Sequence, residues 1–426
     1  MIKIMRFGDV PPSEIFARVS MPSDVSGAVS AIISDVRSRG DEALLEYTHR
    51  FDGASLTALE VTPEEIAEAL EATDKEFLRV LERAAKNIRR FHSCQLRNGF
   101  IINDEDGIVM GQKVIPLEKV GLYVPGGTAS YPSTVLMDAI PAKIAGCREI
   151  CITTPPRKDG SVDKHILAAA HIAGVDRIFK IGGAQAVAAL AYGTGTIPKV
   201  DKIVGPGNAY VAEAKRQVFG EVAIDMIAGP SEILIISDSA SDPAYLAADL
   251  LSQAEHDKLA SAVLITGSSE LAHKVAAEIE AQLQKLERRD IARASIDNNG
   301  KIIIADDIKD AVCIANEIAP EHLELCVDDP FALLDSVRNA GSVFMGRYCP
   351  ESLGDYLAGP NHTLPTSGTA RFSSPLSVDD FVKKSQYTYY TENALGRVAG
   401  DVAMFARAEG LTAHAKSAVI RTEDKK

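Results

Sequence analysis

Apolar side chains in the first 92 residues recur every three or four positions, which is the spacing of an amphipathic helix. Val25, Val29 and Ile32 follow this spacing. Residues 62–65, Thr-Pro-Glu-Glu, have the pattern of a capping box with Pro at the first helical position. The pattern therefore predicts that this part of the chain is helical.

From about residue 108 the pattern changes to short apolar runs, which have the length of buried strands. The runs are Val120–Val124, Ile150–Thr153, Arg177–Ile181, Lys202–Val204, Glu232–Ser237, Ala262–Thr266, Lys301–Ala305 and Ser342–Met345. Helical patterns lie between them, and the clearest are Leu136–Ala145, His165–Ala173, Ala184–Tyr192, Ala209–Gln217 and Ala244–Ala254. This alternation predicts an α/β fold with doubly wound parallel sheets. A chain of 426 residues is long enough for two such domains.

The alternation stops at residues 347–378, which are rich in Pro, Gly and Ser. We expect a long ordered loop there, and such loops in compact enzymes are usually functional. The last 50 or so residues are expected to form one or two helices, which are too short to bury a core of their own. They must therefore dock on the rest of the chain or on another subunit.

Composition excludes some partners. The net charge is −14, and a binder of nucleic acid or of an anionic membrane would need a basic surface instead. No apolar run reaches the roughly 18–20 residues that span a bilayer, and the first residues lack the pattern of a signal peptide. We therefore expect a cytoplasmic protein. Its six cysteines form no CxxC pair, so free thiols are expected, with Cys147 and Cys151 in the core.

Gln253 and His256 are the first candidates for chemistry, because they lie three residues apart at the end of a predicted helix. That spacing places an amide oxygen and an imidazole on one helix face, where both could reach a metal ion. A solvent-facing polar helix end has the same pattern, and Gln is an uncommon zinc ligand. Asp355, in the long loop, could complete a metal site because carboxylates bind zinc well.

Glu321 and His322 follow Pro320, and Pro is favoured where a helix starts. We expect both side chains in the first turn of a helix, where they could act as a pair of proton-transfer groups. An ordinary acidic helix start would look the same. His362 could bind a substrate or brace its loop. Glu409 and His414 are five residues apart and need a bend to converge, and simple surface exposure is the alternative.

Two glycine turns between predicted strands and helices resemble nucleotide-binding turns. Residues 205–208, Gly-Pro-Gly-Asn, have part of a dinucleotide fingerprint, but Tyr210 replaces its third glycine. Asp225 lies at about the distance of the ribose-binding acid. Residues 182–185, Gly-Gly-Ala-Gln, form a similar turn. Both turns place backbone N–H groups at the carboxyl ends of strands, although plain strand–helix turns would share this pattern.

The residues of these motifs, and the order in which the motifs occur, resemble the histidinol dehydrogenase family from about residue 25 to the C-terminus. The runs that carry the resemblance are Gly121–Gly127, Gly182–Gln185, Val204–Asn208, Asp225–Glu232, Ser252–Asp257, Pro320–Leu323 and Gly354–Ser367. No ligand or catalytic position departs from the family pattern.

The resemblance implies a role for each candidate residue. It implies Glu321 and His322 as the catalytic pair. It implies Tyr123, Gln185 and Asn208 as contacts of NAD. The implied zinc ligands are Gln253, His256, Asp355 and His414. The implied substrate-binding residues are Ser231, Gln253, His256, His322, Asp355, Glu409 and His414, with Glu409 and His414 supplied by the partner subunit.

The resemblance also implies two incomplete Rossmann-like domains in a homodimer whose C-terminal tails are exchanged. The expected segments are 1–24, then 25–119 with 233–376 on the zinc side, 120–232 on the NAD side, and 377–426 as the tail. The implied reaction is the four-electron oxidation of L-histidinol to L-histidine, through the aldehyde, with two NAD⁺. A related NAD- and zinc-dependent enzyme for another primary alcohol, a zinc hydrolase and a non-catalytic metal-binding protein are the alternatives.

Overall fold

The computed structural model describes the chain except for residues 1, 19–23, 127–129 and 424–426. It divides into two compact units. The first unit contains residues 1–95 and 117–381, and the second contains residues 96–116 and 382–426. Within the described part, no helix is both long and apolar enough to cross a membrane.

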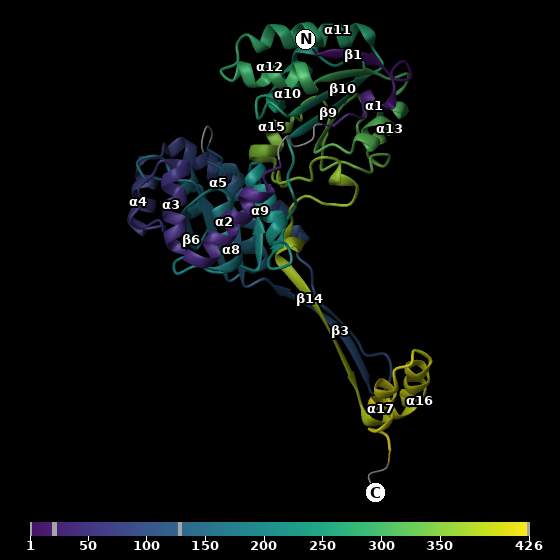
Figure 1. Ribbon diagram of the computed structural model, residues 1–426. Coiled ribbons are helices and arrows are strands. Elements are labelled where there is room, and N and C mark those ends of the chain that lie inside the picture. Colours follow the sequence, from purple (N-terminus) through teal and green to yellow (C-terminus); the bar gives the residue numbers. More distant parts are fainter. Residues whose placement is uncertain (1, 19–23, 127–129, 424–426) are drawn as a thin grey trace. The chain divides into compact units, whose positions relative to one another are not determined.

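A six-stranded parallel sheet forms one half of the first unit (Figure 1). Its strands are β1 (Lys3–Arg6), β9 (Glu232–Ser237), β10 (Ser261–Thr266), β11 (Lys301–Ile304), β12 (His322–Cys326) and β13 (Ser342–Met345). Their order is β1-β11-β10-β9-β12-β13. The chain winds from β9 outward to β11 and then returns to the other side of β9, so the sheet is doubly wound.

The second sheet of this unit is also parallel and has five strands, in the order β6-β5-β4-β7-β8. Its strands are β4 (Lys119–Tyr123), β5 (Glu149–Thr154), β6 (Arg177–Lys180), β7 (Lys202–Val204) and β8 (Ala223–Ile224). This is the Rossmann strand order without its sixth strand. Strands β9–β13 of the six-stranded sheet have the same order. The predicted fold of two incomplete Rossmann-like domains is confirmed.

Alternate residues of the six-stranded sheet pack on helices of opposite faces. Ile233 and Ile235 of β9 join the core of α10–α12, whereas Leu234 and Ile236 join the core of α1 and α13. The helices of this half are α1 (Pro12–Ile15), α10 (Pro243–Ala254), α11 (Ser269–Leu283), α12 (Arg289–Asn299), α13 (Ile308–Ile318) and α14 (Phe331–Leu334). Both faces of the sheet are therefore covered, which explains why its strands are continuous apolar runs.

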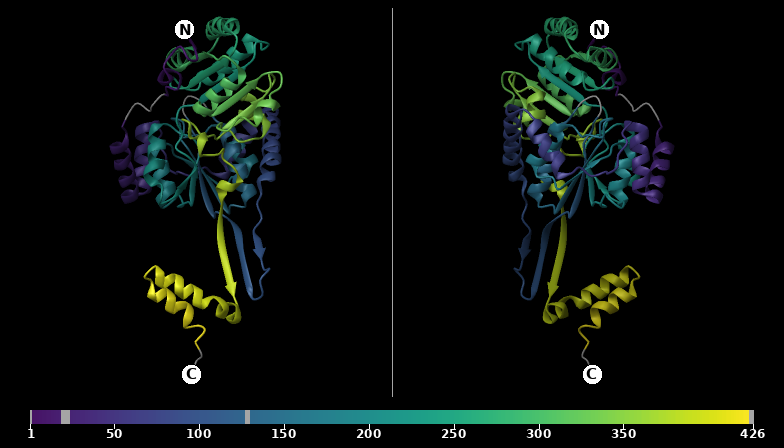
Figure 2. Two further views of the ribbon diagram at one scale, coloured as in Figure 1. Left: turned by 90° about the vertical axis from the view of Figure 1, so that its right-hand side faces the viewer. Right: turned by 90° about the vertical axis from the view of Figure 1, so that its left-hand side faces the viewer.

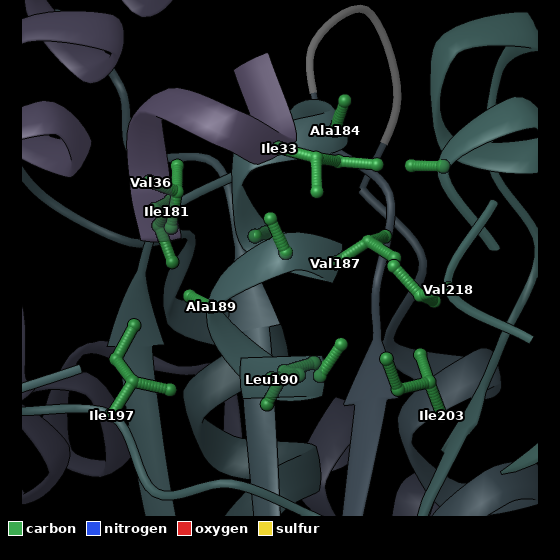
Figure 3. Close-up of a cluster of buried hydrophobic side chains, with 14 of the residues drawn as sticks. Ile33, Val36, Ile181, Ala184, Val187, Ala189, Leu190, Ile197, Ile203 and Val218 are labelled. Atoms are coloured by element: carbon green, nitrogen blue, oxygen red, sulfur yellow. The ribbon is translucent and has the colours of Figure 1, made fainter. Parts of the chain in front are cut away.

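Eight helices surround the five-stranded sheet in the described part of the chain. They are α2 (Ser26–Arg39), α3 (Asp41–Asp52), α4 (Pro63–Ala72), α5 (Lys75–His92), α6 (Pro132–Ala145), α7 (Lys164–Ala173), α8 (Gly183–Tyr192) and α9 (Ala209–Val218). Figure 3 shows Ile33 and Val36 of α2 packed with Val187 and Leu190 of α8, beside Ile203 of β7. We expected residues 25–119 to form one domain with residues 233–376, which contain most of the six-stranded sheet. This packing differs, because the apolar face of α2 is buried in the core of the five-stranded sheet.

The remaining elements of the first unit are short. They are η1 (Ser93–Gln95), α15 (Glu351–Leu353), the π-helical turn η2 (Gly354–Ala358), η3 (Thr369–Arg371) and η4 (Val378–Phe381). The predicted long loop therefore contains several helical turns. The six cysteines are free, as predicted, and Cys147 and Cys151 lie in the core.

The second unit consists of a three-stranded antiparallel sheet and two helices (Figure 2). Its elements are β2 (Phe100–Ile102), β3 (Ile108–Pro116), β14 (Val382–Tyr390), α16 (Glu392–Ala408) and α17 (Thr412–Val419). The expectation of only helices in the tail is wrong, because β14 pairs along its whole length with β3. The expectation that residues 1–92 are helical fails at β1, which pairs with β11.

Candidate functional site

Glu321 and His322 lie at the start of a strand, not of a helix. Helix α13 ends at Ile318, Ala319 adopts a left-handed conformation with φ of 48°, and β12 begins at His322. All five residues of β12 are buried between β9 and β13, so the segment gains sheet pairing on both sides. The prediction of a first helical turn is therefore wrong, although the two side chains do lie together.

The carboxyl group of Glu321 is held by the neighbouring strand. Its Oε2 accepts a hydrogen bond of 2.9 Å from the backbone N–H of Glu232, the first residue of β9. Nδ1 of His322 lies 3.1 Å from the carbonyl oxygen of the same Glu232. A carbonyl can only accept, so Nδ1 carries a proton and Nε2 is the nitrogen that can release or take up a proton.

His322 Nε2 is buried without a hydrogen-bond partner in the described structure, and it lies 3.7 Å from Oδ1 of Asp355. An unpartnered buried nitrogen is costly in a folded protein, so its retention here points to a functional role. Glu321 is 7% exposed and His322 is 4% exposed. Both face a cavity of about 140 Å³.

Burial raises the pKa of Glu321 to about 8, because the charged form loses its hydration. Burial also acts to lower the pKa of His322, but the surrounding carboxylates of Glu321, Asp355 and Glu351 outweigh it and raise this pKa to about 10. Groups with such strongly shifted pKa values, together in a cavity, are typical of an acid–base site.

The predicted metal-binding residues of the first unit converge on the same cavity. Gln253 lies in the last turn of α10, His256 follows that helix, and Asp355 lies in η2. Burial lowers the pKa of His256, which favours the neutral imidazole that binds metals. His256, Glu351 and Asp355 each place one ligand atom within 4.8 Å of the others. Imidazole and carboxylate groups at this spacing suit a divalent cation.

One end of the Gln253 amide lies 3.2 Å from Oε1 of Glu351, and the other lies 3.1 Å from the backbone nitrogen of Glu232. With the amide nitrogen toward Glu351, both contacts are hydrogen bonds. With the oxygen toward Glu351, two acceptors face each other, which is favourable only beside a cation. The residues that fit a metal ion are therefore the clustered imidazole and carboxyl groups of His256, Glu351 and Asp355.

His362 braces the loop that carries Asp355. Its Nδ1 donates to the carbonyl oxygen of Asp355 at 3.1 Å, and its Nε2 lies 3.3 Å from the hydroxyl of Thr134 in α6. Both ring nitrogens thus have protein partners. Asn361 and Thr363 strengthen the same attachment, because they bond to the carbonyl of Met137 and the carboxyl of Asp138 in α6.

The predicted nucleotide contacts lie at the carboxyl edge of the five-stranded sheet. Tyr123 ends β4, and its hydroxyl accepts a hydrogen bond of 3.1 Å from the backbone N–H of Gly183. Gln185 lies in the first turn of α8 and is buried. Asn208 caps α9 by accepting from two backbone N–H groups of its first turn. Asp225 does not serve as a free acid at this edge, because it pairs with Lys215 inside the core.

A second cavity, of about 560 Å³, opens beyond β4 and β5. Asp52 of α3 lines it, together with Gly126 and Pro155. The Oδ2 atom of Asp52 is buried and has no hydrogen-bond partner in the part of the chain that the structure covers. Burial raises the pKa of Asp52 to about 6. A polar ligand with hydroxyl groups would satisfy this oxygen.

The structure brings Ser231 to the first cavity, but it does not place Glu409 and His414 there. Ser231 directly precedes β9 and lines the cavity with Glu321. Glu409 follows α16 and His414 lies in α17, both exposed in the second unit. Gly410, with φ of 79°, makes the bend between the two helices that their spacing requires.

Sequence reasoning missed Glu351 and Glu232. Glu351 opens α15 and is one of the clustered ligand groups. Glu232 contributes its backbone to both Glu321 and His322. For Glu351, the sequence does hold a signal, because Pro350 directly precedes it inside the predicted long loop. No sequence signal marks Glu232, because its role depends on the pairing of β9 with β12.

Comparisons with known proteins agree with these observations. A family model described as histidinol dehydrogenase matches residues 17–422. The chain is 57% identical to histidinol dehydrogenase of Clostridium acetobutylicum over 94% of this chain and 93% of that protein. It is 55% identical to histidinol dehydrogenase of Syntrophotalea carbinolica, with 100% of both chains covered. A crystal structure of histidinol dehydrogenase from Elizabethkingia anophelis matches with a TM-score of 0.93 at 38% identity, covering 99% of this chain and 98% of that one.

Two doubly wound parallel sheets and a buried carboxyl–imidazole pair define an α/β enzyme with an acid–base site. Because the matches extend over nearly the whole of each sequence, the chain belongs to the histidinol dehydrogenase family and is an oxidoreductase.

Proposed function

We propose that this protein oxidises L-histidinol to L-histidine with zinc and two NAD⁺, in the last steps of histidine biosynthesis. The balanced reaction is L-histidinol + 2 NAD⁺ + H₂O → L-histidine + 2 NADH + 3 H⁺. One observation carries the proposal: the Glu321–His322 pair faces the same cavity as Gln253, His256 and Asp355. Acid–base groups and a metal-binding set thus meet at one substrate-sized space.

His322 is the base of the first oxidation. With Nδ1 donating to Glu232, its Nε2 can take the proton of the substrate hydroxyl as hydride leaves for NAD⁺. The aldehyde that forms must take up water before a second hydride can leave. Glu321 activates this water, and His322 again accepts the proton of the resulting hydroxyl. The two adjacent groups therefore serve two consecutive oxidations.

Gln253, His256, Asp355 and His414 would hold the zinc ion, with His414 supplied by the second unit of a partner subunit. Zinc held there would supply Lewis acidity for nitrogen donors of the substrate, which would fix the orientation of the substrate. A cation bound to Asp355 also opposes the carboxylates that raise the pKa of His322. Metal binding and the basicity of His322 are therefore linked.

NAD⁺, which accepts the hydride, would bind at the carboxyl edge of the five-stranded sheet. Tyr123, Gln185 and Asn208 lie at this edge. Asp52 adds a buried carboxyl oxygen that has no hydrogen-bond partner among the described residues, which suits a ribose hydroxyl. This edge is where ligands bind in open α/β sheets.

We further propose a cytoplasmic homodimer in which Glu409 and His414 reach the site of the partner. Both residues are exposed, and the second unit also exposes large apolar side chains, including Met404 and Phe405 of α16. Exposed apolar groups of this size are typical of protein interfaces. The second unit is too small to bury them by itself.

An assay of NADH formation tests the proposed substrate. Purified protein is given NAD⁺ with histidinol or with other amino alcohols, before and after chelation of metal. We expect turnover of histidinol that chelation abolishes and added zinc restores. Preference for a different primary alcohol would favour the related dehydrogenase, and turnover without NAD⁺ would favour a zinc hydrolase. Full activity without metal would refute the role of zinc.

A further inference from the structure

Lys215 is a buried lysine of α9 for which the proposed reaction has no role. It is 2% exposed, and lysines are rarely buried so completely. Its Nζ donates a hydrogen bond of 2.9 Å to the carbonyl oxygen of Gly205 and forms an ion pair with Oδ1 of Asp225. Because apolar side chains of similar size often stabilise a core as well as a buried ion pair does, stability alone does not explain this lysine.

The backbone of Gly205 is held from both sides by this pair. Its N–H donates a hydrogen bond of 2.8 Å to Oδ2 of Asp225, while Lys215 holds its carbonyl oxygen. Its φ is 111°, and a Cβ atom there would clash with the carbonyl oxygen of Tyr123 at the end of β4. The pair therefore fixes a backbone position that has room only for glycine.

Gly205 opens the turn of residues 205–208, which joins β7 to α9. The chain leaves β4 on one side toward β5 and β6, and it returns on the other side of β4 at β7. The crevice between the carboxyl ends of β4 and β7 is therefore the switch point at which open α/β sheets bind ligands. Pro206 of the same turn lines the cavity that His322 faces. The turn thus lies between the proposed nucleotide edge and the reacting groups.

We infer that Lys215 is a positioning residue for the nucleotide: together with Asp225 it keeps the turn of residues 205–208 where NAD⁺ requires it. This inference rests on the proposed use of NAD⁺ and deepens it. A displaced turn would move Asn208 and the N–H groups that begin α9. Binding of the nucleotide therefore depends on Lys215, although this side chain is buried beneath the turn, whereas binding of histidinol does not.

Lys215→Met tests this directly, because it keeps the apolar stem of the side chain and removes the donor to Gly205. NADH fluorescence measures Kd for NADH in zinc-loaded protein, and steady-state assays give KM for NAD⁺ and for histidinol. We expect Kd for NADH and KM for NAD⁺ to rise about tenfold or more, because a small displacement of positioning groups is costly. KM for histidinol at saturating NAD⁺ should change less than about twofold, as for sites without shared partners.

Lys202→Met is the matched control, because Lys202 is a second buried lysine beside the same turn in sequence. It is 8% exposed and pairs with Asp380 at 2.8 Å, but it lies at the amino end of β7, away from Gly205. We expect it to lower Tm as Lys215→Met does and to leave KM for NAD⁺ unchanged. The double variant Lys215→Met with Asp225→Asn leaves no buried charge unpaired. It should raise KM for NAD⁺ as Lys215→Met does, and it answers the question if the single variant does not fold.

An unchanged KM for NAD⁺ in a folded variant without Lys215, or an equal rise in Lys202→Met, would overturn the inference and leave the proposed reaction intact. If neither variant without Lys215 folds while Lys202→Met does, the pair serves stability, and the inference is also overturned. A wild-type protein that neither binds NADH nor reduces NAD⁺ would instead refute the proposed function on which the inference rests.

Discussion

A carboxyl group that is closed off from water keeps its proton to a higher pH, and Glu321 is such a group. Its pKa is raised to about 8 by burial, so its basic form increases as the pH rises through 8. We predict that oxidation of the aldehyde speeds up at least about tenfold per pH unit below pH 8, and that it continues to rise to pH 9 because His322, with a pKa of about 10, must also lose a proton. Stopped-flow NADH formation from histidinal between pH 6 and 9 measures this rate. A rate that is flat across this range would contradict it.

Glu321→Gln separates the two oxidations. The amide keeps the size of the side chain and can still accept from Glu232, but it cannot activate water. We predict that oxidation of histidinol to the aldehyde is spared and that oxidation of the aldehyde falls at least 100-fold. Single-turnover NADH formation from each substrate measures both steps. Equal losses in both would show that Glu321 does not activate the water.

Asp138 gives a prediction about stability. Complete burial raises its pKa from 3.8 to about 8, with the nearby Asp225 adding to this effect against Thr363 and Lys215. Between these pH values the folded state keeps a proton that the unfolded state has lost, so stability falls as the pH rises, by up to about 1.4 kcal/mol per pH unit. Asp138→Asn should remove this loss. Urea unfolding at pH 5 and pH 8 compares the two proteins, and equal pH slopes would contradict the account.

At the scale of single residues, the sequence predicts the roles of side chains that act through their own functional groups. Glu321, His322, Gln253 and His256 were found because their residue types and spacing suggest proton transfer or metal binding. Glu232 could not be found, since it acts through backbone atoms that only strand pairing brings to the site.

At the scale of elements, the loop after α15 positions the site by its attachment to α6. The side chain of Asn361 donates to the carbonyl of Met137 at 2.6 Å and accepts from the N–H of Thr363 at 2.8 Å. We predict that Asn361→Ala destabilises the protein by about 1–3 kcal/mol and raises KM for histidinol, because Asp355 and His362 lose their support.

Asn316→Ala is the control for that variant. Asn316 of α13 makes similar bonds to another loop, at the backbone of Ser336, Arg338 and Asn339. Chemical unfolding and steady-state kinetics should show a similar loss of stability with an unchanged KM. If both variants raise KM equally, the attachment of the loop has no specific effect on the site.

The central strands of the parallel sheets were predicted because both faces are buried and their apolar runs are unbroken. Strand β12 was missed, since Pro320 suggested a helix start and the alternating His-Leu-Glu-Leu pattern is short. Strands β2 and β14 were missed for a different reason. Their side chains are largely exposed, so the apolar pattern that marks a buried strand is absent.

At the scale of the whole molecule, strand–helix alternation predicted two doubly wound domains. It did not predict that α2 and α3 share the core of the five-stranded sheet, because an apolar helix face does not say which sheet will bury it. The second unit was predicted only as a docking tail. Its pairing of β3 with β14 joins segments about 270 residues apart, which local patterns do not reveal.

Exchange of tails between subunits makes a prediction about mixtures of inactive variants. His322→Ala removes the proposed base from the first unit, and His414→Ala removes a proposed zinc ligand from the second unit. If each site uses the tail of the partner, a mixed dimer contains one intact site. We predict that mixing the two variants under conditions of subunit exchange restores up to about a quarter of the wild-type activity. No recovery, despite exchange shown by mass spectrometry, would exclude shared sites.

The yield of NADH per histidinol consumed tests the central claim most directly, because both oxidations are assigned to one site. Histidinol is exhausted in excess NAD⁺, NADH is measured by its absorbance, and the product is identified by mass spectrometry. The account predicts two NADH per histidinol, with histidine as the product. One NADH per histidinol, with the aldehyde accumulating, would contradict it.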